Sequence, residues 1–332
     1  MNIKFIAEAG VNHNGKLIIA KKLIKVAAKA GADYIKFQAF NADSLVKKGT
    51  QKAKYQKENT KNNEDQYKML KKLQLNEKDF KILHKECKKN KINFLLSIFD
   101  VESLKIIKEL KLKVIKIPSG EITNYFLLSK LANYKFKIIL STGMATVKEI
   151  KEAIKILTSK VINKKDITIL QCTTDYPTKY TDVNLRAMNT LKKNLKMNVG
   201  LSDHTIGKLN PLIAAMLGAN LIEKHFTLSK NDQGPDHKAS LDPKELKELI
   251  QDLKNIPLIL GSSKKTPTKN EIINKALVRK SIVAKKEIKK GEKFSLDNLT
   301  AKRPGIGISP MKFKFLINKK SKKNFRKDEL IK

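Results

Sequence analysis

Eight short apolar runs, separated by amphipathic stretches, limit the folds open to this chain more than any other feature. Each run is six or seven residues long and rich in Ile, Leu, Val or Phe. That length and composition are typical of strands buried on both faces of a parallel sheet. The runs are Phe5–Gly10, Tyr34–Ala39, Asn93–Phe99, Val114–Gly120, Lys137–Gly143, Ile167–Thr173, Asn198–His204 and Asn220–Phe226.

Helices are predicted between these strands because apolar residues recur there at helical spacing. The helical segments are Leu17–Ala30, Asp79–Lys89, Val101–Leu110, Thr146–Thr158 and Pro243–Leu253. Alternating strands and helices with a single kind of strand predict a (β/α)8 barrel. An open, doubly wound sheet is the alternative. No Gly-x-Gly-x-x-Gly follows any run, which argues against that alternative.

Two regions depart from the alternation. The second and third strands are separated by a polar segment, Asn41 to about Leu75, which we expect to form a lid ending in a helix over Asp65–Leu73. After residue 260 the alternation stops. We therefore expect a barrel over residues 1–260, a linker over 261–276 and a small separate domain over 277–332.

The chain is strongly basic, with 70 Lys and Arg against 32 Asp and Glu, a formal net charge of +38. Such a charge would suit nucleic-acid binding. However, the lysines are spread along the whole chain, aromatics make up 6% and Trp is absent, so few residues could stack on bases. We interpret the charge as a lysine-rich surface and expect no nucleic-acid partner.

No apolar run reaches the roughly 18 residues of a membrane-spanning helix. The first residues lack the features of a secretory signal, and we expect a cytoplasmic protein. The two cysteines, Cys87 and Cys172, cannot form a disulfide framework or a paired zinc motif. Cys172 is predicted to be a small core residue.

Polar residues follow the apolar part of every predicted strand. They are Glu8, Asn12, His13 and Asn14; Lys36 and Gln38; Ser97; Lys116, Ser119 and Glu121; Ser141 and Thr142; Thr173 and Thr174; Ser202, Asp203 and His204; and Glu223, Lys224 and His225. In a (β/α)8 barrel the active site lies at these strand ends. Burying so many polar groups is costly unless they pair or bind a ligand, so we expect one polar cavity.

The histidines suggest a metal. His204 and His225 end adjacent strands, and two imidazoles facing an open cavity suit a divalent transition ion with free positions for substrate. The alternative is a pair of core histidines hydrogen-bonded to neighbouring carboxylates.

The lysines suggest an anion. Lys36 and Lys116 lie inside apolar runs, and together with the strand-end hydroxyls they suit a phosphate or a carboxylate. The alternative is a set of internal ion pairs with Glu8 or Glu121.

Several motifs carry these residues. They are Ala7-Glu8-Ala9-Gly10-Val11-Asn12-His13-Asn14-Gly15, Lys36-Phe37-Gln38, Lys116-Ile117-Pro118-Ser119-Gly120-Glu121, Ser141-Thr142-Gly143-Met144, Ser202-Asp203-His204-Thr205, Glu223-Lys224-His225-Phe226-Thr227 and Gly234-Pro235-Asp236-His237. In this order they resemble the sialic acid synthase family, which includes legionaminate synthases. The tail, from Arg279-Lys280-Ser281 to Lys302-Arg303-Pro304-Gly305, is similar to that family's antifreeze-like (SAF) domain.

The resemblance implies a (β/α)8 barrel followed by a SAF domain, in a homodimer whose small domains each cover the partner's barrel. It implies an enzyme that condenses phosphoenolpyruvate with N-acetylmannosamine or a close analogue, and water, to give N-acetylneuraminate or an analogue and phosphate. Legionaminate synthases use 2,4-diacetamido-2,4,6-trideoxymannose instead, and residues 7–15 and 120–124 lean toward them. A nucleic-acid-binding protein on a degenerate barrel is the remote alternative, in which the strand-end residues would be dispensable.

The same resemblance implies a role for each matching residue. His204 and His225 would hold a divalent metal, Mn²⁺ first, with Mg²⁺ or Co²⁺ as alternatives. The phosphoenolpyruvate contacts would be Lys36, Ser97, Lys116, Ser119, Thr174 and Ser202. The sugar contacts would be Gln38, Glu121, Tyr176, Asp236 and, from the partner chain, Arg303. The catalytic acid or base would be Glu8 or Glu121.

Three positions depart from the family's pattern. Ile98 stands where the family usually has a proline in the third strand, Ile306 where it usually has an asparagine and Asn318 where it usually has a glycine. We expect these changes to affect sugar recognition and the packing of the small domain more than the metal and phosphate chemistry.

Overall fold

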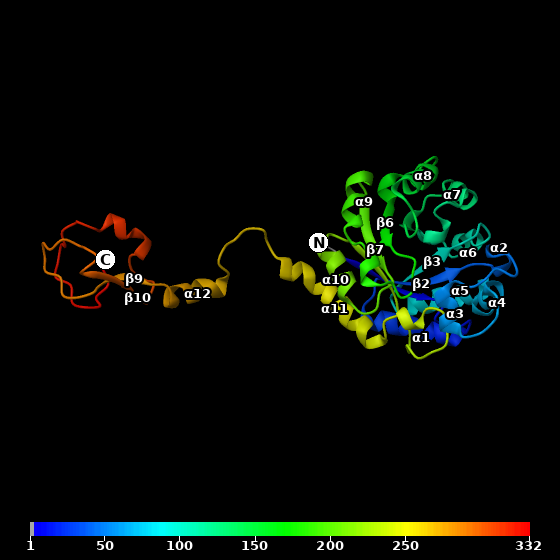
Figure 1. Cartoon of the computed structure of the whole chain (residues 1–332), viewed down its shortest axis with the longest axis horizontal. Helices are drawn as coiled ribbons and strands as arrows, with labels where there is room; N and C mark the ends of the chain where they lie inside the picture. Colours follow the sequence, from blue (N-terminus) through cyan, green and yellow to red (C-terminus); the bar gives the residue numbers. More distant parts are fainter. Residues whose placement is uncertain (1–2) are drawn as a thin grey trace. The chain divides into compact units, whose positions relative to one another are not determined.

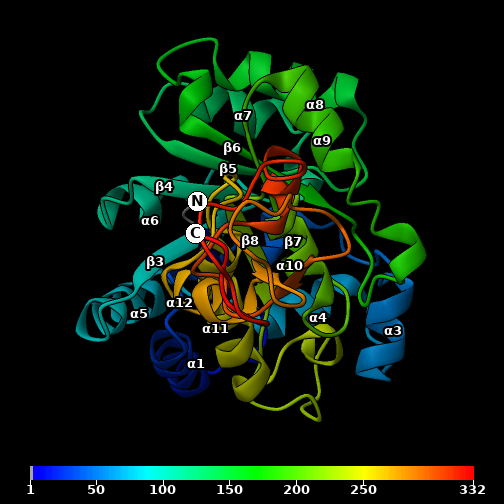
Figure 2. The same ribbon diagram turned by 90° about the vertical axis from the view of Figure 1, so that its left-hand side faces the viewer.

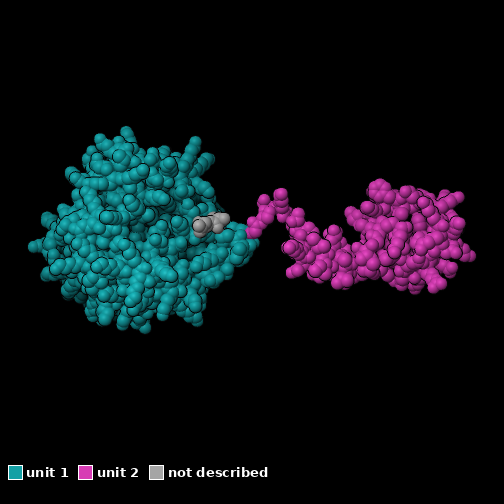
Figure 3. Space-filling view, turned by 180° about the vertical axis from the view of Figure 1, so that it is seen from behind, with its two compact units in different colours: residues 1–260 teal, residues 261–332 magenta. Residues whose placement is uncertain are grey.

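The computed structural model describes residues 3–332 and divides into two compact units, residues 1–260 and residues 261–332 (Figure 3). We describe each unit by itself. Among the described residues, no helix is both long enough and apolar enough to cross a membrane.

The first unit is a closed barrel of eight parallel strands, as predicted, and the open-sheet alternative is wrong (Figure 1). The strands are β1 (Lys4–Gly10), β2 (Tyr34–Ala39), β3 (Asn93–Ile98), β4 (Val114–Ile117), β5 (Lys137–Ser141), β6 (Ile167–Cys172), β7 (Asn198–Asp203) and β8 (Leu221–His225). β1 closes the barrel, because Glu8 lies opposite Lys36 of β2 on one side and His225 of β8 on the other.

Helices surround the strands (Figure 2). They are α1 (Leu17–Ala30), α5 (Glu77–Lys89), α6 (Leu104–Glu109), α7 (Tyr125–Leu131), α8 (Val147–Leu157), α9 (Ala187–Leu195), α10 (Leu209–Met216) and α11 (Pro243–Leu260). Their apolar faces pack on the outward-facing strand residues, as Leu23 and Ile24 of α1 do. Local signals set their ends: in α8, Thr146 and Glu149 form a capping box.

The inside of the barrel is layered because side chains alternate between the two faces of a strand. An apolar plug of Ile6, Leu95, Ile139, Leu170 and Leu221 fills one level. Two residues further along each of these strands stand Glu8, Ser97, Ser141, Cys172 and Glu223, which line a cavity instead. The alternation therefore places an apolar layer directly below the polar residues that form the floor of the cavity.

The segment between β2 and β3 forms three short helices. They are α2 (Ala42–Leu45), α3 (Lys54–Thr60) and α4 (Gln66–Leu73). The helix predicted over Asp65–Leu73 corresponds to α4, whereas α2 and α3 were not predicted. Met69 and Leu73 of α4 are buried against Val11 and Phe40, which attaches the segment to the barrel.

The second unit contains one helix and a small sheet. α12 (Lys269–Val278) lies within the segment expected to be a linker, so much of residues 261–276 is helical. β9 (Ser281–Ala284) pairs antiparallel with β10 (Leu299–Lys302) over a small core that includes Ile282 and Phe325. Asn318 replaces the family's glycine at φ 66°, a left-handed conformation that Asn tolerates better than most residues.

Candidate functional site

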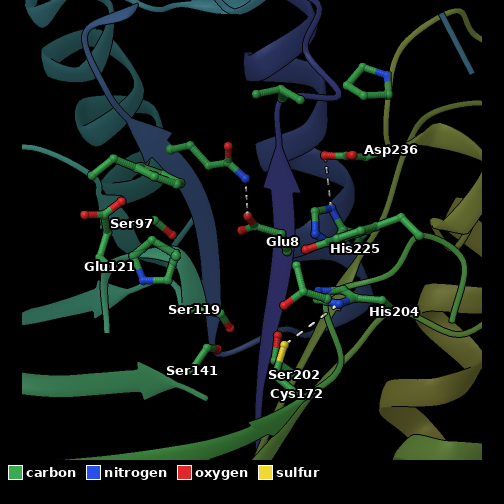
Figure 4. A pocket seen from close by; sticks show the side chains of 18 of the residues that line it. Glu8, Ser97, Ser119, Glu121, Ser141, Cys172, Ser202, His204, His225 and Asp236 are labelled. Atoms are coloured by element: carbon green, nitrogen blue, oxygen red, sulfur yellow. Dashed lines mark hydrogen bonds and ion pairs between the residues drawn. The ribbon is translucent and has the colours of Figure 1, made fainter. Parts of the chain in front are cut away.

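A cavity of about 340 Å³ lies at the carboxyl ends of the barrel strands (Figure 4). Every site residue predicted within the barrel lines it: Glu8, Lys36, Gln38, Ser97, Lys116, Ser119, Glu121, Thr174, Tyr176, Ser202, His204, His225 and Asp236. Arg303 lies in the second unit, directly after β10, and its side chain is exposed. The sequence prediction of one shared polar cavity is therefore confirmed.

The floor of the cavity is a buried charge network that we call the ion-pair layer: Glu8, Lys36, Ser97, Lys116, Ser202 and Glu223. Glu223 lies at its centre. Its Oε1 accepts hydrogen bonds from Lys116 Nζ at 3.0 Å and from Ser202 Oγ at 2.9 Å. Lys36 Nζ is 3.6 Å from the same oxygen.

Lys36 joins this layer to β1 and β3. Its Nζ donates to Ser97 Oγ at 2.7 Å and lies 2.9 Å from Glu8 Oε1. The internal ion pair with Glu8 that the sequence left open is therefore present, and it lines the same cavity as the proposed anion site. The pair with Glu121 is not present among the described residues.

The protonation of the two carboxyls in this layer differs. Burial raises the pKa of both, but for Glu223 the two lysine ammonium groups outweigh burial and hold its pKa at about 2. For Glu8 burial prevails and raises the pKa. The two carboxyls therefore differ in acidity although both contact Lys36. Glu8 Oε2 and Glu223 Oε2 are buried without a hydrogen-bond partner.

Above this floor, His204 and His225 come together, as predicted for neighbouring strand ends. Their ring centroids are 5.5 Å apart. His204 Nδ1 lies 2.7 Å from the Thr173 carbonyl oxygen, so Nδ1 carries a proton. Although burial alone would lower it, the pKa of His204 is raised by the neighbouring Cys172 and by this carbonyl. His225 Nδ1 is buried without a hydrogen-bond partner, 3.9 Å from Asp236 Oδ2. We call these two rings and Asp236 the histidine layer.

The donors of the histidine layer fit a divalent metal. Burial holds the pKa of His225 well below its usual range, which keeps the ring neutral, as a metal ligand must be. Within residues 3–332, no three His, Cys, Asp or Glu side chains are placed to hold an ion. An ion bound by the two imidazoles would have to take its remaining ligands from substrate or water.

A second buried ion pair lies behind the histidines, on the outer face of the sheet. Lys224 Nζ contacts Asp203 Oδ2 and donates to the Thr205 carbonyl oxygen at 2.6 Å. Asp203 and Lys224 directly precede the two histidines in β7 and β8, and both are fully buried. The pair therefore joins the two strands at the point where they present their imidazoles.

The remaining predicted contacts lie around the rim. Tyr176 packs on His204 with ring centroids 4.0 Å apart, and Tyr55 of α3 stacks on the other side of Tyr176 at 4.9 Å. Gln38 Nε2 donates to Glu8 Oε1 at 3.2 Å. Glu121 Oε2 accepts from Asn124 Nδ2 at 2.6 Å, and burial raises the pKa of Glu121.

Ser119 and Thr174 meet at a glycine. A Cβ on Gly143 would lie 2.2 Å from Thr174 Oγ1 and 2.9 Å from Ser119 Oγ. The Gly143 N–H donates to Ser119 Oγ at 2.9 Å. Only a residue without a side chain lets both hydroxyls approach the backbone here, which fixes them at the edge of the cavity.

Sequence reasoning missed three participants. Glu223 was noted only as a polar strand residue, although a carboxylate between Lys36 and Lys116 is what two buried ammonium groups require. Cys172 was predicted to be a core residue, but it lines the cavity with Sγ 3.9 Å from His204 Nδ1. No sequence pattern predicts a site role for Tyr55, because its contact with Tyr176 depends on the position of α3 relative to the barrel.

Ile98 and Ile306 have different surroundings. Ile98 is buried in the outer core of the barrel and does not line the cavity. Ile306 is 66% exposed in the second unit.

Fold and site together define a (β/α)8-barrel protein with a cavity lined by charged and hydroxyl side chains at the carboxyl ends of its strands. Comparison with known proteins identifies the group. Residues 23–265 match the NeuB family and residues 279–332 match the SAF domain. The chain belongs to the NeuB family.

Its relatives are synthases. The chain is 52% identical to the N,N'-diacetyllegionaminic acid synthase of Campylobacter jejuni over 98% of both chains. It is 43% identical to the synthase of the same name in Legionella pneumophila, over 98% of this chain and 92% of that one. A crystal structure of N-acetylneuraminic acid synthetase from Leptospira borgpetersenii, in complex with citrate, superposes with a TM-score of 0.71 at 35% identity, covering 82% of this chain and 90% of that one. The protein is therefore an enzyme.

Proposed function

We propose that this enzyme condenses phosphoenolpyruvate with an N-acetylated mannosamine-type sugar and water, releasing a nine-carbon nonulosonate and phosphate. The observation that carries the proposal is the ion-pair layer directly beneath two facing imidazoles in one cavity. The favoured sugar is 2,4-diacetamido-2,4,6-trideoxymannose, since the legionaminic acid synthases are 52% and 43% identical to this chain. N-acetylneuraminate-9-phosphate synthases are only 29% and 32% identical.

The ion-pair layer supplies the phosphoenolpyruvate site. Lys36 and Lys116 would neutralise the phosphate and carboxylate of this substrate, and the hydroxyls of Ser97, Ser119, Thr174 and Ser202 would donate to its oxygens. Glu223 would keep both ammonium groups in place, because it already binds them without a ligand. The substrate would thus meet donors that need no rearrangement.

The reaction joins C3 of phosphoenolpyruvate to the sugar aldehyde carbon, while water adds to C2. The resulting tetrahedral carbon expels phosphate as its C–O bond breaks. Two buried carboxyls with raised pKa values can serve these proton transfers. Glu8 lies in the floor, beside the proposed position of C2, and suits the water step. Glu121 lies at the rim and suits protonation of the new alkoxide.

His204 and His225 would hold the metal, with Mn²⁺ first and Mg²⁺ or Co²⁺ as alternatives. A divalent ion bound there would polarise the sugar aldehyde as a Lewis acid. Tyr176, Gln38 and Asp236 would orient the sugar around it. The Tyr55–Tyr176 stack covers His204 and would help to exclude bulk water from the reactive intermediate.

A homodimer would complete the sugar site with Arg303 of the partner chain. Within the second unit by itself, α12 exposes several apolar side chains: Ile272, Ile273, Leu277 and Val278 are each more than half exposed. Four exposed apolar side chains on one short helix suit burial against a second copy of the chain.

The test is phosphate release from phosphoenolpyruvate with each sugar in turn. We expect turnover with 2,4-diacetamido-2,4,6-trideoxymannose, complete loss after metal chelation and recovery on adding Mn²⁺. His204→Ala should abolish turnover while phosphoenolpyruvate still binds. Full activity in chelator-treated enzyme would show that no metal is needed. If phosphate is released with neither 2,4-diacetamido-2,4,6-trideoxymannose nor N-acetylmannosamine, the proposed function is wrong.

A further inference from the structure

The segment between β2 and β3 gives the catalytic cavity a wall that is apolar. This apolar wall consists of Leu45 and Val46 from the end of α2 and Met69, Leu70 and Leu73 from α4. Val11 and Phe99, which follow β1 and β3, extend it. The strands contribute charges and hydroxyls to the same cavity, so its two ends differ in the ligand groups that they can accept.

The apolar wall is held in place by contacts with the barrel. Met69 and Leu73 are 3% and 8% exposed because they pack on Val11 and Phe40. The segment is also tied down by its backbone: the Ala42 N–H donates to Gln74 Oε1 at 3.0 Å. Its contact surface is therefore largely preformed, as in most small-molecule sites.

Three residues of the wall leave part of their surface to the cavity. Leu45, Val46 and Leu70 are only half-buried, and all three line the pocket. Apolar surface of this kind gains free energy when a ligand's methyl group covers it. A ligand hydroxyl placed there would lose its water without gaining a partner.

Two amide side chains lie beside the wall. Gln56 and Gln66 line the cavity, and Gln66 Nε2 is 3.4 Å from Gln56 Oε1. Gln56 Oε1 is already occupied, because it also accepts from the Ala53 N–H at 3.0 Å, and Gln56 Nε2 donates to the Tyr55 hydroxyl at 3.3 Å. Each amide nitrogen keeps a second N–H, and Gln66 Oε1 accepts no hydrogen bond from the described residues, so together the two side chains still offer a donor and an acceptor. An acylamino group, which has one N–H and one C=O, matches them.

We propose that the apolar wall and its two glutamines make this enzyme select 2,4-diacetamido-2,4,6-trideoxyhexoses over sugars with hydroxyls at C4 and C6. The inference rests on the proposed function, since it takes the sugar aldehyde to lie beside His204 and His225. The open sugar chain then extends from the strand ends toward the β2–β3 segment. The C6 methyl group covers Leu45, Val46 or Leu70, and the C4 acetamido group meets Gln56 or Gln66.

A polar substitution in the wall tests this selectivity. Val46→Thr keeps the shape of the side chain and adds a hydroxyl, and Leu70→Asn replaces an apolar branch with an amide of similar size. Val161→Thr is the matched control, because Val161 is exposed and lies outside the cavity. For each protein, kcat/KM for phosphate release is measured with 2,4-diacetamido-2,4,6-trideoxymannose and with N-acetylmannosamine, at saturating phosphoenolpyruvate and Mn²⁺.

We expect the ratio of the two kcat/KM values to favour the trideoxy sugar in the parent enzyme. The ratio should fall about tenfold to a hundredfold in Leu70→Asn and Val46→Thr, the range set by single apolar groups in a pocket. It should stay constant in Val161→Thr. The KM for phosphoenolpyruvate should hold in all of them, which excludes a general folding defect.

The assay distinguishes a failure of the inference about the wall from a failure of the proposed function. If the parent enzyme turns over a sugar but both wall variants keep its ratio, the inference about the wall is wrong and the proposed function stands. If the two sugars lose activity equally, the wall supports the fold and does not select. If neither sugar releases phosphate with the parent enzyme, the proposed function and this inference fall together.

Discussion

The two polar layers inside the barrel differ in how far their groups are already paired. In the ion-pair layer, Lys36, Lys116 and one oxygen of Glu223 satisfy one another at 3.0–3.6 Å. In the histidine layer, His225 Nδ1 has no partner and its carboxylate neighbour is 3.9 Å away. The charged nitrogens of the ion-pair layer are therefore paired with carboxylate oxygens, whereas in the histidine layer one ring nitrogen of His225 has no partner.

This difference follows from the cost of burying charge. An unpaired ammonium group in the barrel interior would cost several kcal/mol, so the lysines must have a carboxylate whether or not substrate is present. A neutral imidazole is much cheaper to bury, and it can wait for a metal or a substrate. The comparison teaches that the ion-pair layer also supports the fold, whereas the histidine layer contributes less to stability.

The largest expected effect is on stability. Lys116→Met removes one partner from a buried network and should destabilise the protein by about 3–5 kcal/mol, which lowers the Tm by roughly 6–20 °C. His225→Ala should leave the Tm nearly unchanged, because it breaks no hydrogen bond of the ring's Nδ1. Both variants should lose phosphate release. Thermal unfolding and the phosphate assay, run side by side, measure the two effects.

The matched control is Lys113→Met, an exposed lysine next to β4. It should shift the free energy of unfolding by no more than about 0.5 kcal/mol. Equal Tm values for Lys116→Met and His225→Ala would erase the proposed distinction between the layers.

A smaller effect is expected behind the histidine layer. Lys224 and Asp203 join β7 to β8 next to the two histidines, so Asp203→Asn, which keeps the side chain's shape, should loosen their placement. We expect Mn²⁺ affinity to fall about 10–100-fold, as for other groups that orient metal ligands. Isothermal titration with Mn²⁺ measures this directly.

Phosphoenolpyruvate binding should not change in Asp203→Asn, because the ion-pair layer does not include this residue. Lys208→Met is the control, since it breaks a half-exposed ion pair with Glu248 at a distance from the cavity. Unchanged Mn²⁺ affinity in Asp203→Asn would show that the histidines are held by the strands alone.

The smallest expected effect concerns Arg303, the one proposed site residue that lies outside the barrel. The ion-pair layer lies wholly within one barrel, whereas the proposed sugar site also needs Arg303 from a partner chain. Arg303→Ala should raise the sugar KM about tenfold, the loss of one charge-assisted hydrogen bond, and leave the phosphoenolpyruvate KM unchanged. Steady-state kinetics with each substrate varied in turn measures this, with Arg326→Ala, exposed in the same unit, as the control. A sugar KM that does not move would remove Arg303 from the site.

Much of the site was predictable because the barrel imposes a period of two on each strand. Leu95 and Ser97, two residues apart on β3, both point into the barrel interior. The apolar layer and the polar floor can therefore be predicted from the sequence. Adjacent strands then bring His204 and His225 together without further information. The resemblance to known synthases added chemical roles to residues that the pattern had already gathered.

The sequence by itself determined the barrel, its polar mouth and the strand-end residues predicted to line it, because these depend on local periodicity and strand order. Only the tertiary structure decided which groups pair. Glu223 became the shared partner of Lys36 and Lys116, Cys172 came to lie beside His204, and the β2–β3 segment became an apolar wall. Such contacts join residues from different strands and loops, and their distances depend on how the whole barrel closes.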